Sequence, residues 1–490
     1  MVPLLILASC GGDSPAPPAA APKAPAAPTA RVRGVLLVSI DTLRQDRLGL
    51  YGYGRSTSLN LDGLARRATV FDGARAQASQ TAPSHASVFT STFAGEHGIY
   101  NVHAEDAQWP TLPPGVTTLA EDLQGAGVLT AAFVSGGNLT KKMEMNRGFD
   151  VWDERMEDVS GRVDALLHWL RGVGDRPFFA LLHTYQVHAP YVPPKDRADA
   201  FTDPAYQGPL RATYERYLAM PMAEAFALGV GEDYWGKEMI DYTDADVKFL
   251  SDLYDGEIAY VDGELRRAYE AVVKGPRAAD TAIIVFGDHG EEFRDHGKFQ
   301  HDQVFDELVH VPLLIDAGGA LERQGWKGRV ARAVQLVDLA PTIAELLGVA
   351  APTDRWEGHS LVPLLQPETR ADAEGRDAPP VFSELTREHG TQDYHAITWH
   401  GWKYILHRQP SIGKAWEHLF HLEMDPGEKI NLIDSTDAAP TQALAGLRAQ
   451  LQAFTERNAA VRSHLGESAG AEMSPEDKQA LKSLGYVGGH

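Results

Sequence analysis

Short apolar runs alternate with amphipathic stretches along most of this chain. Four runs are almost continuous in apolar residues, which is typical of parallel strands buried on both faces. They cover residues 35–40, 128–134, 177–182 and 281–287. Stretches with helical spacing separate them, at residues 58–68, 117–125, 164–171 and 253–273. Strands that alternate with helices predict an open α/β sheet, in which ligands bind beyond the carboxyl ends of the strands.

Several of these strands end in residues that bind metal ions. Asp41 follows the first strand, His183 the third, and Asp288 with His289 the fourth. Because the carboxyl ends of parallel strands lie at one edge of a sheet, we expect these side chains to converge. Taken alone, either aspartate is better explained as a cap of the next helix than as a metal ligand. Together they favour a site for Mn²⁺, Zn²⁺ or Ca²⁺.

Thr81 stands where another helix is predicted to begin. Pro83 suits a first helical turn, and residues 85–90 carry apolar positions that can face a core. Unpaired N–H groups and the helix dipole favour a phosphate or sulfate group at such a helix start. A cation nearby would lower the pKa of the Thr81 hydroxyl. The alternative is that Thr81 only caps the helix.

Composition limits the size of the core, the classes of partner and the disulfides that the chain can form. The chain has 490 residues, of which 43% are hydrophobic, so it is long enough for one large core and a smaller unit. Its formal net charge of -22 argues against nucleic acid as a partner, because a binder needs a basic face. One cysteine, Cys10, excludes an intrachain disulfide.

The N-terminus predicts export and a lipid anchor. Residues 1–9 form a short apolar run before Cys10, which resembles the lipobox of bacterial lipoprotein signal peptides. The resemblance implies cleavage there and lipidation of Cys10, with residues 10–32 as a Pro/Ala-rich tether. The folded part would then lie in the periplasm or at the cell surface. No Lys or Arg precedes Cys10, so a chance apolar N-terminus is the alternative.

The fold is predicted to begin at residue 33 and to divide into two units. Residues 33–367 would form the large α/β domain and residues 368–490 a smaller unit, joined by a polar linker at residues 368–380. Residues 381–432 have the pattern of short strands, and residues 444–454 have helical spacing. Ser474 and Pro475 open a last helix.

Six motifs in a fixed order carry a family resemblance. The chain after the tether resembles the sulfatase family of the alkaline phosphatase superfamily. The motifs lie at residues 35–53, 79–85, 286–292, 310–314, 338–342 and 425–428. The resemblance implies an α/β fold with a large central mixed sheet flanked by helices and a smaller C-terminal antiparallel-sheet-plus-helix subdomain. It also implies a metal-dependent enzyme acting on phosphate or sulfate esters.

Position by position, the resemblance implies roles for individual residues. Thr81 takes the place of the nucleophile, and His188 that of a histidine beside the transferred group or the leaving oxygen. His301 takes the place of a cationic residue over the same group, with Lys298 as the nearby alternative. The implied metal ligands are Asp41, Thr81, Asp288 and His289. The implied catalytic residues are Thr81, His188 and His301, and the implied substrate-binding residues are His85, Lys298 and His183.

Departures from the family pattern bear on the chemistry. Sulfatases carry Cys or Ser at the position of Thr81, converted to formylglycine, and Arg at the position of His85. A threonine cannot become that aldehyde, so no formylglycine is expected. Thr42 replaces the second metal-binding aspartate, which leaves one expected divalent ion. We therefore expect phosphoester chemistry by in-line attack of Thr81, with a histidine protonating the leaving group.

Two alternatives stay open at this point. One is a sulfatase that uses threonine directly, and the other is a non-catalytic envelope protein that kept the fold as a binding module. The expected substrate is a small-molecule, glycan or lipid ester. An insertion at residues 191–246 follows His188 closely and is expected to overhang the site and shape substrate choice. His310, directly before a predicted strand, is expected to be structural.

Overall fold

The computed structural model describes residues 31–102, 106–220, 242–352, 354–386, 392–466 and 468–483. The predicted signal sequence, Cys10 and nearly all of the tether lie outside these ranges. Contacts with the fold include residues slightly earlier than the predicted start at residue 33, because the N–H groups of Arg31 and Val32 both donate to the Leu346 carbonyl and Val32 is buried. None of the helices in the described ranges combines the length and apolarity that a bilayer-spanning segment needs.

An eight-stranded sheet forms the centre of the large unit, in the order β11-β2-β10-β7-β1-β6-β4-β5. Only β10 runs antiparallel to its neighbours within this sheet, so the predicted mixed α/β sheet is confirmed. The strands are β1 (Gly34–Ile40), β2 (Thr69–Arg75), β4 (Leu129–Phe133), β5 (Val151–Asp153), β6 (Phe178–Thr184), β7 (Thr281–Gly287), β10 (Leu313–Asp316) and β11 (Gly328–Gln335).

The strands β2, β5 and β11 are absent from the runs that the apolar pattern predicts. Strand β2 carries Asp72 and Arg75, and β11 carries two arginines and has several exposed or half-buried positions. Strand β5 has only three residues, at the far edge of the sheet. A strand that is not buried on both faces has no continuous apolar run, so this pattern misses it.

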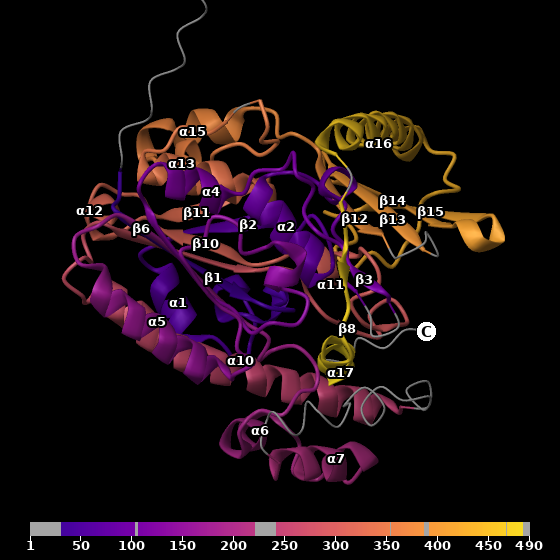
Figure 1. Ribbon diagram of the computed structural model, residues 1–490. Helices are drawn as coiled ribbons and strands as arrows, with labels where there is room; N and C mark the ends of the chain where they lie inside the picture. Colours follow the sequence, from indigo (N-terminus) through magenta and orange to yellow (C-terminus); the bar gives the residue numbers. More distant parts are fainter. Residues whose placement is uncertain are drawn as a thin grey trace, which may run out of the picture.

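Helices cover both faces of the sheet (Figure 1). Strand β1 shows why: Val35 and Leu37 pack into one apolar cluster, and Leu36 and Val38 into the other. Alternate side chains of a strand point to opposite faces, so both faces must be apolar. The first face carries α2 (Thr81–Thr90), α4 (Leu119–Gly125) and α13 (Leu339–Leu347), and the second α1 (Leu59–Ala65), α5 (Val159–Val173) and α10 (Asp244–Val273).

The register at the centre of the sheet sets the position of the site. Ile40, the last residue of β1, pairs with Thr184 of β6 and with Gly287 of β7. The residues that follow these strand ends therefore lie level at one edge. Asp41 and Asp288 come from adjacent strands there, as predicted.

A second sheet forms the C-terminal part, in the order β12-β13-β14-β15. It is antiparallel throughout, as predicted. One face packs on α16 through Leu447, Leu451 and Phe454, and the other on residues 304–309. The elements are β12 (Val381–Thr386), β13 (Asp393–Trp399), β14 (Trp402–Gln409), β15 (Lys414–His421), α16 (Ala438–Leu465) and α17 (Pro475–Ser483).

The predicted linker at residues 368–380 is wrong in part, because a helix forms there. Helix α15 (Pro367–Gly375) follows α14 (Val362–Leu365) and packs near β11. Arg370 fixes it by donating to the carbonyl oxygens of Leu364, Leu365 and Lys327. The stretch is polar because only Ala373 is buried, so its composition resembles a linker. The proposed division after residue 367 stays a prediction.

The insertion after His188 is described at residues 191–220 and 242–246. Its helices α6 (Lys195–Phe201) and α7 (Pro209–Leu218) lie beside α10, on the side away from the sheet (Figure 1). Tyr206 stacks on Phe249 of α10 with ring centroids 4.3 Å apart. This part of the insertion stabilises α10. Its expected effect on substrate choice stays a prediction.

Short elements complete the described chain. They are η1 (Gln45–Arg47), η2 (Gly49–Tyr51), α3 (Ala94–His97), β3 (Gln108–Trp109), η3 (Lys141–Met143), β8 (Glu292–Phe293), β9 (Phe299–Gln300), α11 (Asp306–Val309), α12 (Gly319–Glu322), η5 (Leu336–Asp338), η7 (Pro410–Ile412) and β16 (Ala471–Glu472).

His395 gives the C-terminal sheet a testable pH dependence. Burial alone would lower its pKa, but contacts with Asp393 (2.8 Å) and Glu384 (3.3 Å) raise the pKa of His395 to about 10. The stabilisation should be complete below about pH 6.5, the unfolded value, and should be lost as the pH rises through 10. We expect His395→Gln to lower the free energy of unfolding by a few kcal/mol (~3) at pH 6 and by much less at pH 10.

The measurement is urea unfolding of the wild type and the variant across this pH range. His464→Gln is the matched control, because His464 is exposed near the end of α16. An effect of His395→Gln that is the same at pH 6 and pH 10 would contradict the assigned charge.

Candidate active site

Four side chains predicted to hold a metal ion meet at the carboxyl edge of the sheet. Asp41, Asp288 and His289 offer ligand atoms that all lie within 4.8 Å of one another. All three residues are fully buried. Thr81 joins them from the start of α2, where its Oγ1 donates to Asp41 Oδ2 at 3.1 Å. The predicted convergence of these residues is confirmed, while their role as ligands stays a prediction.

The atoms left unsatisfied in this group fit a divalent cation. Asp288 Oδ1 accepts the N–H groups of Thr42 and His289, and His289 Nδ1 donates to the Gly290 carbonyl. This leaves Asp41 Oδ1, Asp288 Oδ2 and His289 Nε2 buried without a hydrogen-bond partner among the described residues. Buried polar atoms in proteins nearly always have a partner. Two carboxylate oxygens and one imidazole nitrogen are suitable ligands for Mn²⁺, Zn²⁺ or Ca²⁺.

The pKa values of Asp41 and Asp288 are both raised, which agrees with two buried carboxyl groups that lack a counter-charge. Burial raises the pKa of Asp41 to about 8, although hydrogen bonds from Thr81 and Asp288 oppose the rise. Burial and the neighbouring Asp41 raise the pKa of Asp288 well above its usual range. Ionising both of two carboxyl groups this close has a large electrostatic free-energy cost unless a positive charge lies between them. A cation would supply that charge.

Backbone strain marks the loop that follows Asp41. Thr42 has φ of 54°, which is unfavourable for a β-branched residue, and its buried Oγ1 has no partner among the described residues. Tyr254 of α10 holds this turn, because its hydroxyl donates to the Thr42 carbonyl (2.6 Å) and accepts from the Arg44 N–H (2.9 Å). Tertiary contacts therefore hold Thr42 in its strained backbone conformation.

Thr81 is the first residue of α2, and it does not cap the helix. Gln80 holds the capping position, and Pro83 lies within the first turn, as predicted. The Ser84 hydroxyl donates to the Asp288 carbonyl at 2.7 Å, which ties the helix to the loop that carries Asp288 and His289. All ten residues of α2 are buried. The Thr81 hydroxyl is thus presented at a rigid, positively polarised helix end.

His85 and His183 lie beneath this group. His85 Nδ1 donates to the Thr81 carbonyl and its Nε2 accepts from the Ser39 hydroxyl, both at 2.9 Å. His85 therefore supports the first turn of α2. His183 Nε2 lies 3.4 Å from Asp41 Oδ2, and burial lowers the pKa of His183 to about 3. The substrate-binding roles predicted for both stay predictions.

The two predicted catalytic histidines contact each other. His188 Nε2 and His301 Nε2 are 3.3 Å apart, and the His301 ring centroid lies 4.5 Å from that of His289. His188 Nδ1 donates to the Ala189 carbonyl at 2.6 Å, so its Nε2 accepts from His301. Burial, followed by the nearby His301, lowers the pKa of His188 to about 3. An anionic ester beside the pair would favour its protonated form.

Lys298 and two other histidines lie outside this group. Lys298 Nζ is 3.4 Å from the Tyr394 hydroxyl, so it points toward the C-terminal sheet. Its predicted contact with substrate stays a prediction. His296 pairs with Glu307 at 2.6 Å. His310 donates to the Asp72 carbonyl at 2.7 Å, in accord with its expected structural role.

Asn101 is a candidate site residue that the sequence reasoning missed. It is buried, and its Oδ1 accepts the N–H of Ala82, the residue after Thr81, at 2.8 Å. Its Nδ2 has no hydrogen-bond partner among the described residues. A donor without a partner in the described part of the chain is thus held beside the first turn of α2, next to Thr81 in sequence. The only signal in the sequence is a polar residue between the apolar Ile99 and Val102, which is too common to be informative.

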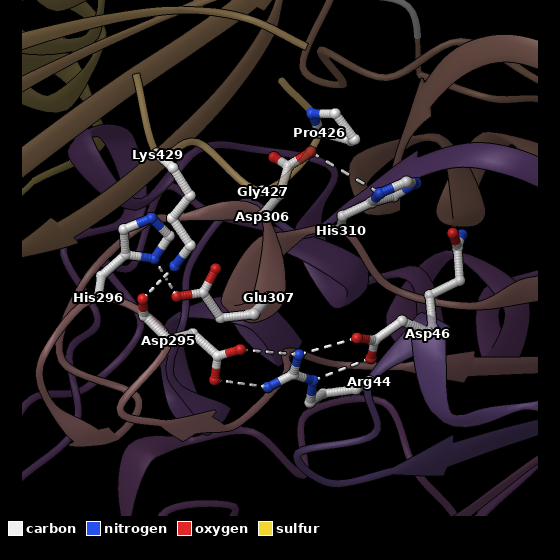
Figure 2. A pocket seen from close by; sticks show the side chains of 11 residues that line it. Arg44, Asp46, Asp295, His296, Asp306, Glu307, His310, Pro426, Gly427 and Lys429 are labelled. Atoms are coloured by element: carbon white, nitrogen blue, oxygen red, sulfur yellow. Dashed lines mark hydrogen bonds and ion pairs between the residues drawn. The ribbon is translucent and has the colours of Figure 1, made fainter. Parts of the chain in front are cut away.

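A pocket near the site serves a different purpose (Figure 2). Its volume is about 210 Å³, and Pro426, Gly427 and Lys429 line one part of it. Arg44 pairs there with Asp46 (2.8 Å) and Asp295 (2.9 Å). His296 contacts Glu307, His310 contacts Asp306, and Lys429 donates to the Asp295 carbonyl. We interpret this pocket as a polar joint between the large unit and the C-terminal sheet.

Comparison with known proteins gives a family match over most of the chain. The family model described as Sulfatase matches residues 33–349, and a second one, N-sulphoglucosamine sulphohydrolase, C-terminal, matches residues 294–457. A Delta 4,5-hexuronate-2-O-sulfatase of Bacteroides thetaiotaomicron is 23% identical, over 86% of this chain and 89% of its own length.

Solved structures share the fold. A 2-O GAG sulfatase superposes with a TM-score of 0.67 at 20% identity, covering 91% of this chain and 96% of its own. The phosphonate monoester hydrolase of Agrobacterium radiobacter gives a TM-score of 0.64 at 20% identity, covering 90% of this chain and 100% of its own. Both sulfate- and phosphonate-cleaving enzymes are thus found on this architecture.

Because the buried carboxylates lack a counter-charge, we expect Asp288→Asn to have different effects on thermal stability without and with Mn²⁺. Asp288→Asn keeps an oxygen for the N–H groups of Thr42 and His289 but removes one buried negative charge. In a chelator, we expect the variant to melt at the same temperature as the wild type or higher. With Mn²⁺ added, only the wild type should gain stability, and the variant should bind the ion more than about 100-fold more weakly.

Calorimetric melting with and without Mn²⁺ measures both effects. Asp338→Asn is the matched control, because Asp338 is buried and accepts backbone N–H groups of Gln335 and His359 away from the site. It should lower the melting temperature in both conditions and keep the response to Mn²⁺. An equal response to Mn²⁺ in Asp288→Asn would show that the ion binds elsewhere.

Proposed function

This chain belongs to the sulfatase family and is a hydrolase of the alkaline-phosphatase-like superfamily, and from that premise we propose that Thr81 itself attacks its ester substrate. The observation that carries this proposal is the position of Thr81. Its hydroxyl lies at the start of a buried helix, 3.1 Å from Asp41. The catalytic candidates His301 and His188 contact each other, and the His301 ring centroid lies 4.5 Å from that of His289 in the same group. We propose that phosphoesters are its preferred substrates.

The residues around Thr81 supply the parts of an in-line displacement. Asp41, Asp288, His289 and Thr81 would hold one divalent cation, which supplies positive charge that lowers the pKa of the Thr81 hydroxyl and offsets charge on the transferred group. Asn101 Nδ2 can donate a hydrogen bond to a non-bridging oxygen, and the positive end of the α2 dipole favours the anionic group. The Asn101 donor is fixed in place before the substrate arrives.

Two steps complete the reaction. In the first, the Thr81 hydroxyl gives its proton to Asp41 Oδ2, which accepts its hydrogen bond at 3.1 Å, and a bond forms between Thr81 Oγ1 and phosphorus. The bond to the leaving oxygen breaks, and the His188–His301 pair gives that oxygen a proton. In the second, water or an alcohol attacks phosphorus from the side that the leaving oxygen left and gives its proton to the histidine pair. The bond to Thr81 then breaks, and Asp41 returns the proton to Thr81 Oγ1.

The chemistry of threonine favours phosphorus over sulfur as the reacting centre. A formylglycine adduct is released by elimination, because the hydrated aldehyde has a second hydroxyl on the same carbon. Thr81 has one hydroxyl, so its adduct must be released by a second attack on the transferred group. Phosphotransferases and phosphodiesterases of this superfamily are similar in using such a threonine. Direct cleavage of sulfate esters is the alternative, which the hexuronate sulfatase relative supports.

We also propose a substrate class and a location. Esters of small molecules, glycans or lipids would reach a protein anchored through a lipidated Cys10 in the bacterial envelope, with the catalytic unit exposed to the periplasm or the surroundings. The apolar run before Cys10 supports this proposal. Labelling of the full-length protein by a fatty-acid probe in bacteria should be lost in Cys10→Ser. Equal labelling of the two proteins would refute the anchor.

The role of Thr81 predicts a graded set of activities. With Mn²⁺ and an aryl phosphodiester, we expect Thr81→Ala to lower kcat by at least about 1,000-fold and Thr81→Ser to retain most of it. Asn101→Ala should lower kcat by about 100-fold, as expected for the loss of one donor to the transferred group. Aryl phosphoesters should react faster than the corresponding aryl sulfate.

Steady-state kinetics on matched 4-nitrophenyl esters tests these expectations. Ser87→Ala is the control, because Ser87 lies on the same helix and its hydroxyl contacts His97 at 3.1 Å instead of the site. Faster turnover of the sulfate would reverse the order of the two chemistries. No turnover of any ester by a protein that binds Mn²⁺ would favour the non-catalytic binding module.

A further inference from the structure

One buried carboxylate holds both ends of the loop that carries His188. The loop follows β6 and precedes α6. Glu257, in the middle of α10, is fully buried. Its Oε2 accepts a hydrogen bond from Gln186 Nε2 at 3.0 Å, and its Oε1 accepts one from the Val192 N–H at 2.7 Å. The two oxygens of one side chain therefore close the loop two residues before His188 and four residues after it.

The direction of the His188 ring depends on the shape of this loop. The His188 N–H donates to the Tyr185 carbonyl at 2.9 Å, and Nδ1 donates to the Ala189 carbonyl at 2.6 Å. These bonds fix the ring relative to its own backbone, so His188 Nε2 meets His301 only if the loop as a whole keeps its place. Tyr191 adds an apolar contact, with its ring centroid 5.7 Å from that of Tyr254.

Packing alone does not explain an ionisable residue at position 257. Burial is the largest influence on its pKa and raises the pKa of Glu257 to about 8, which reflects the unfavourable removal of a carboxylate from water. A well-packed apolar side chain at such a position is often as stable or more stable. What an apolar side chain cannot do is accept hydrogen bonds from two points of one loop.

We propose that Glu257 is a positioning residue, which holds the loop so that His188 Nε2 stays in contact with His301 and within reach of the leaving oxygen. This inference rests on the proposed function, in which the His188–His301 pair protonates that oxygen. Glu257 itself contacts neither the substrate nor the metal group.

The substitution Glu257→Gln removes one of the two contacts at almost constant volume. The glutamine oxygen can accept from either Gln186 or Val192, but its amide then faces the other donor. The loop should loosen, and proton transfer from His188 should suffer, because a shift of about 1 Å in a reacting group lowers a rate by about 100-fold. The chemistry at Thr81 should be affected little.

The readout is the dependence of kcat/KM on the leaving group, measured with Mn²⁺ on a series of phosphodiesters from 4-nitrophenyl to phenyl to simple alkyl. A 4-nitrophenolate leaves without protonation, whereas an alkoxide needs a proton. We expect Glu257→Gln to reduce turnover of the alkyl ester by about 10- to 100-fold and of the 4-nitrophenyl ester by less than about 3-fold. His188→Ala should show the same pattern more strongly.

A second variant and a matched control make the result specific. Gln186→Ala removes one of the two donors from the loop side and should give the same pattern, even if Glu257→Gln folds poorly. Asp262→Asn is the control, because Asp262 is a buried carboxylate on the same helix that accepts the N–H groups of Asn60 and Leu61 at 2.8 Å each. It holds α1 instead of the loop, so it should lower stability without changing the leaving-group dependence.

The outcomes separate this inference from the function on which it rests. If His188→Ala steepens the dependence while Glu257→Gln and Gln186→Ala lower all rates equally, the positioning role is refuted and the acid role of His188 stands. If His188→Ala leaves the dependence unchanged, the acid role fails, and the positioning role fails with it. A steeper dependence in all three variants, with Asp262→Asn unchanged, supports the proposal.

Discussion

The close approach of two buried carboxyl groups is the constraint on which this site depends. Asp41 and Asp288 follow adjacent strands whose last residues pair directly, so the sheet register brings them together. Neither has enough donors to satisfy both of its oxygens within the described chain. Such a pair destabilises a fold that has no counter-charge. The Asp41–Asp288 pair is therefore best explained if the protein binds a cation there, either as it folds or afterwards.

Other parts of the structure fix Thr81 relative to this pair. The C-terminal sheet docks on the segment that precedes α2, because the Ser383 hydroxyl donates to the Ala76 carbonyl (2.6 Å) and the Glu384 N–H to that of Gln77 (2.8 Å). Buried Lys403 also ties this sheet to α11 through Asp306 at 2.8 Å. The second sheet thus helps to fix the segment that carries Thr81, although the two lie far apart in the sequence.

Much of this arrangement can be predicted from the sequence. The features that allow this prediction also explain which contacts the sequence does not reveal. Strands buried on both faces have continuous apolar runs, and Asp41 and Asp288 follow such runs directly. Asn101 accepts one backbone N–H of α2, and Glu257 accepts the Gln186 side chain and the Val192 N–H, and no spacing or periodicity in the sequence reports such contacts. His85 shows the same limit in another way: its ring is used by Ser39 and by the Thr81 carbonyl, which only the folded helix reveals.

A crystal structure with Mn²⁺ and vanadate would show whether Thr81 and the two aspartates share one cation, because vanadate mimics the transferred group and manganese has an anomalous signal. We expect one strong anomalous peak in contact with Asp41, Asp288, His289 and Thr81, and vanadium bonded to Thr81 Oγ1 with His188 and His301 on the side of the leaving group. Manganese bound away from the two aspartates, or vanadium bonded to another side chain, would contradict this expectation.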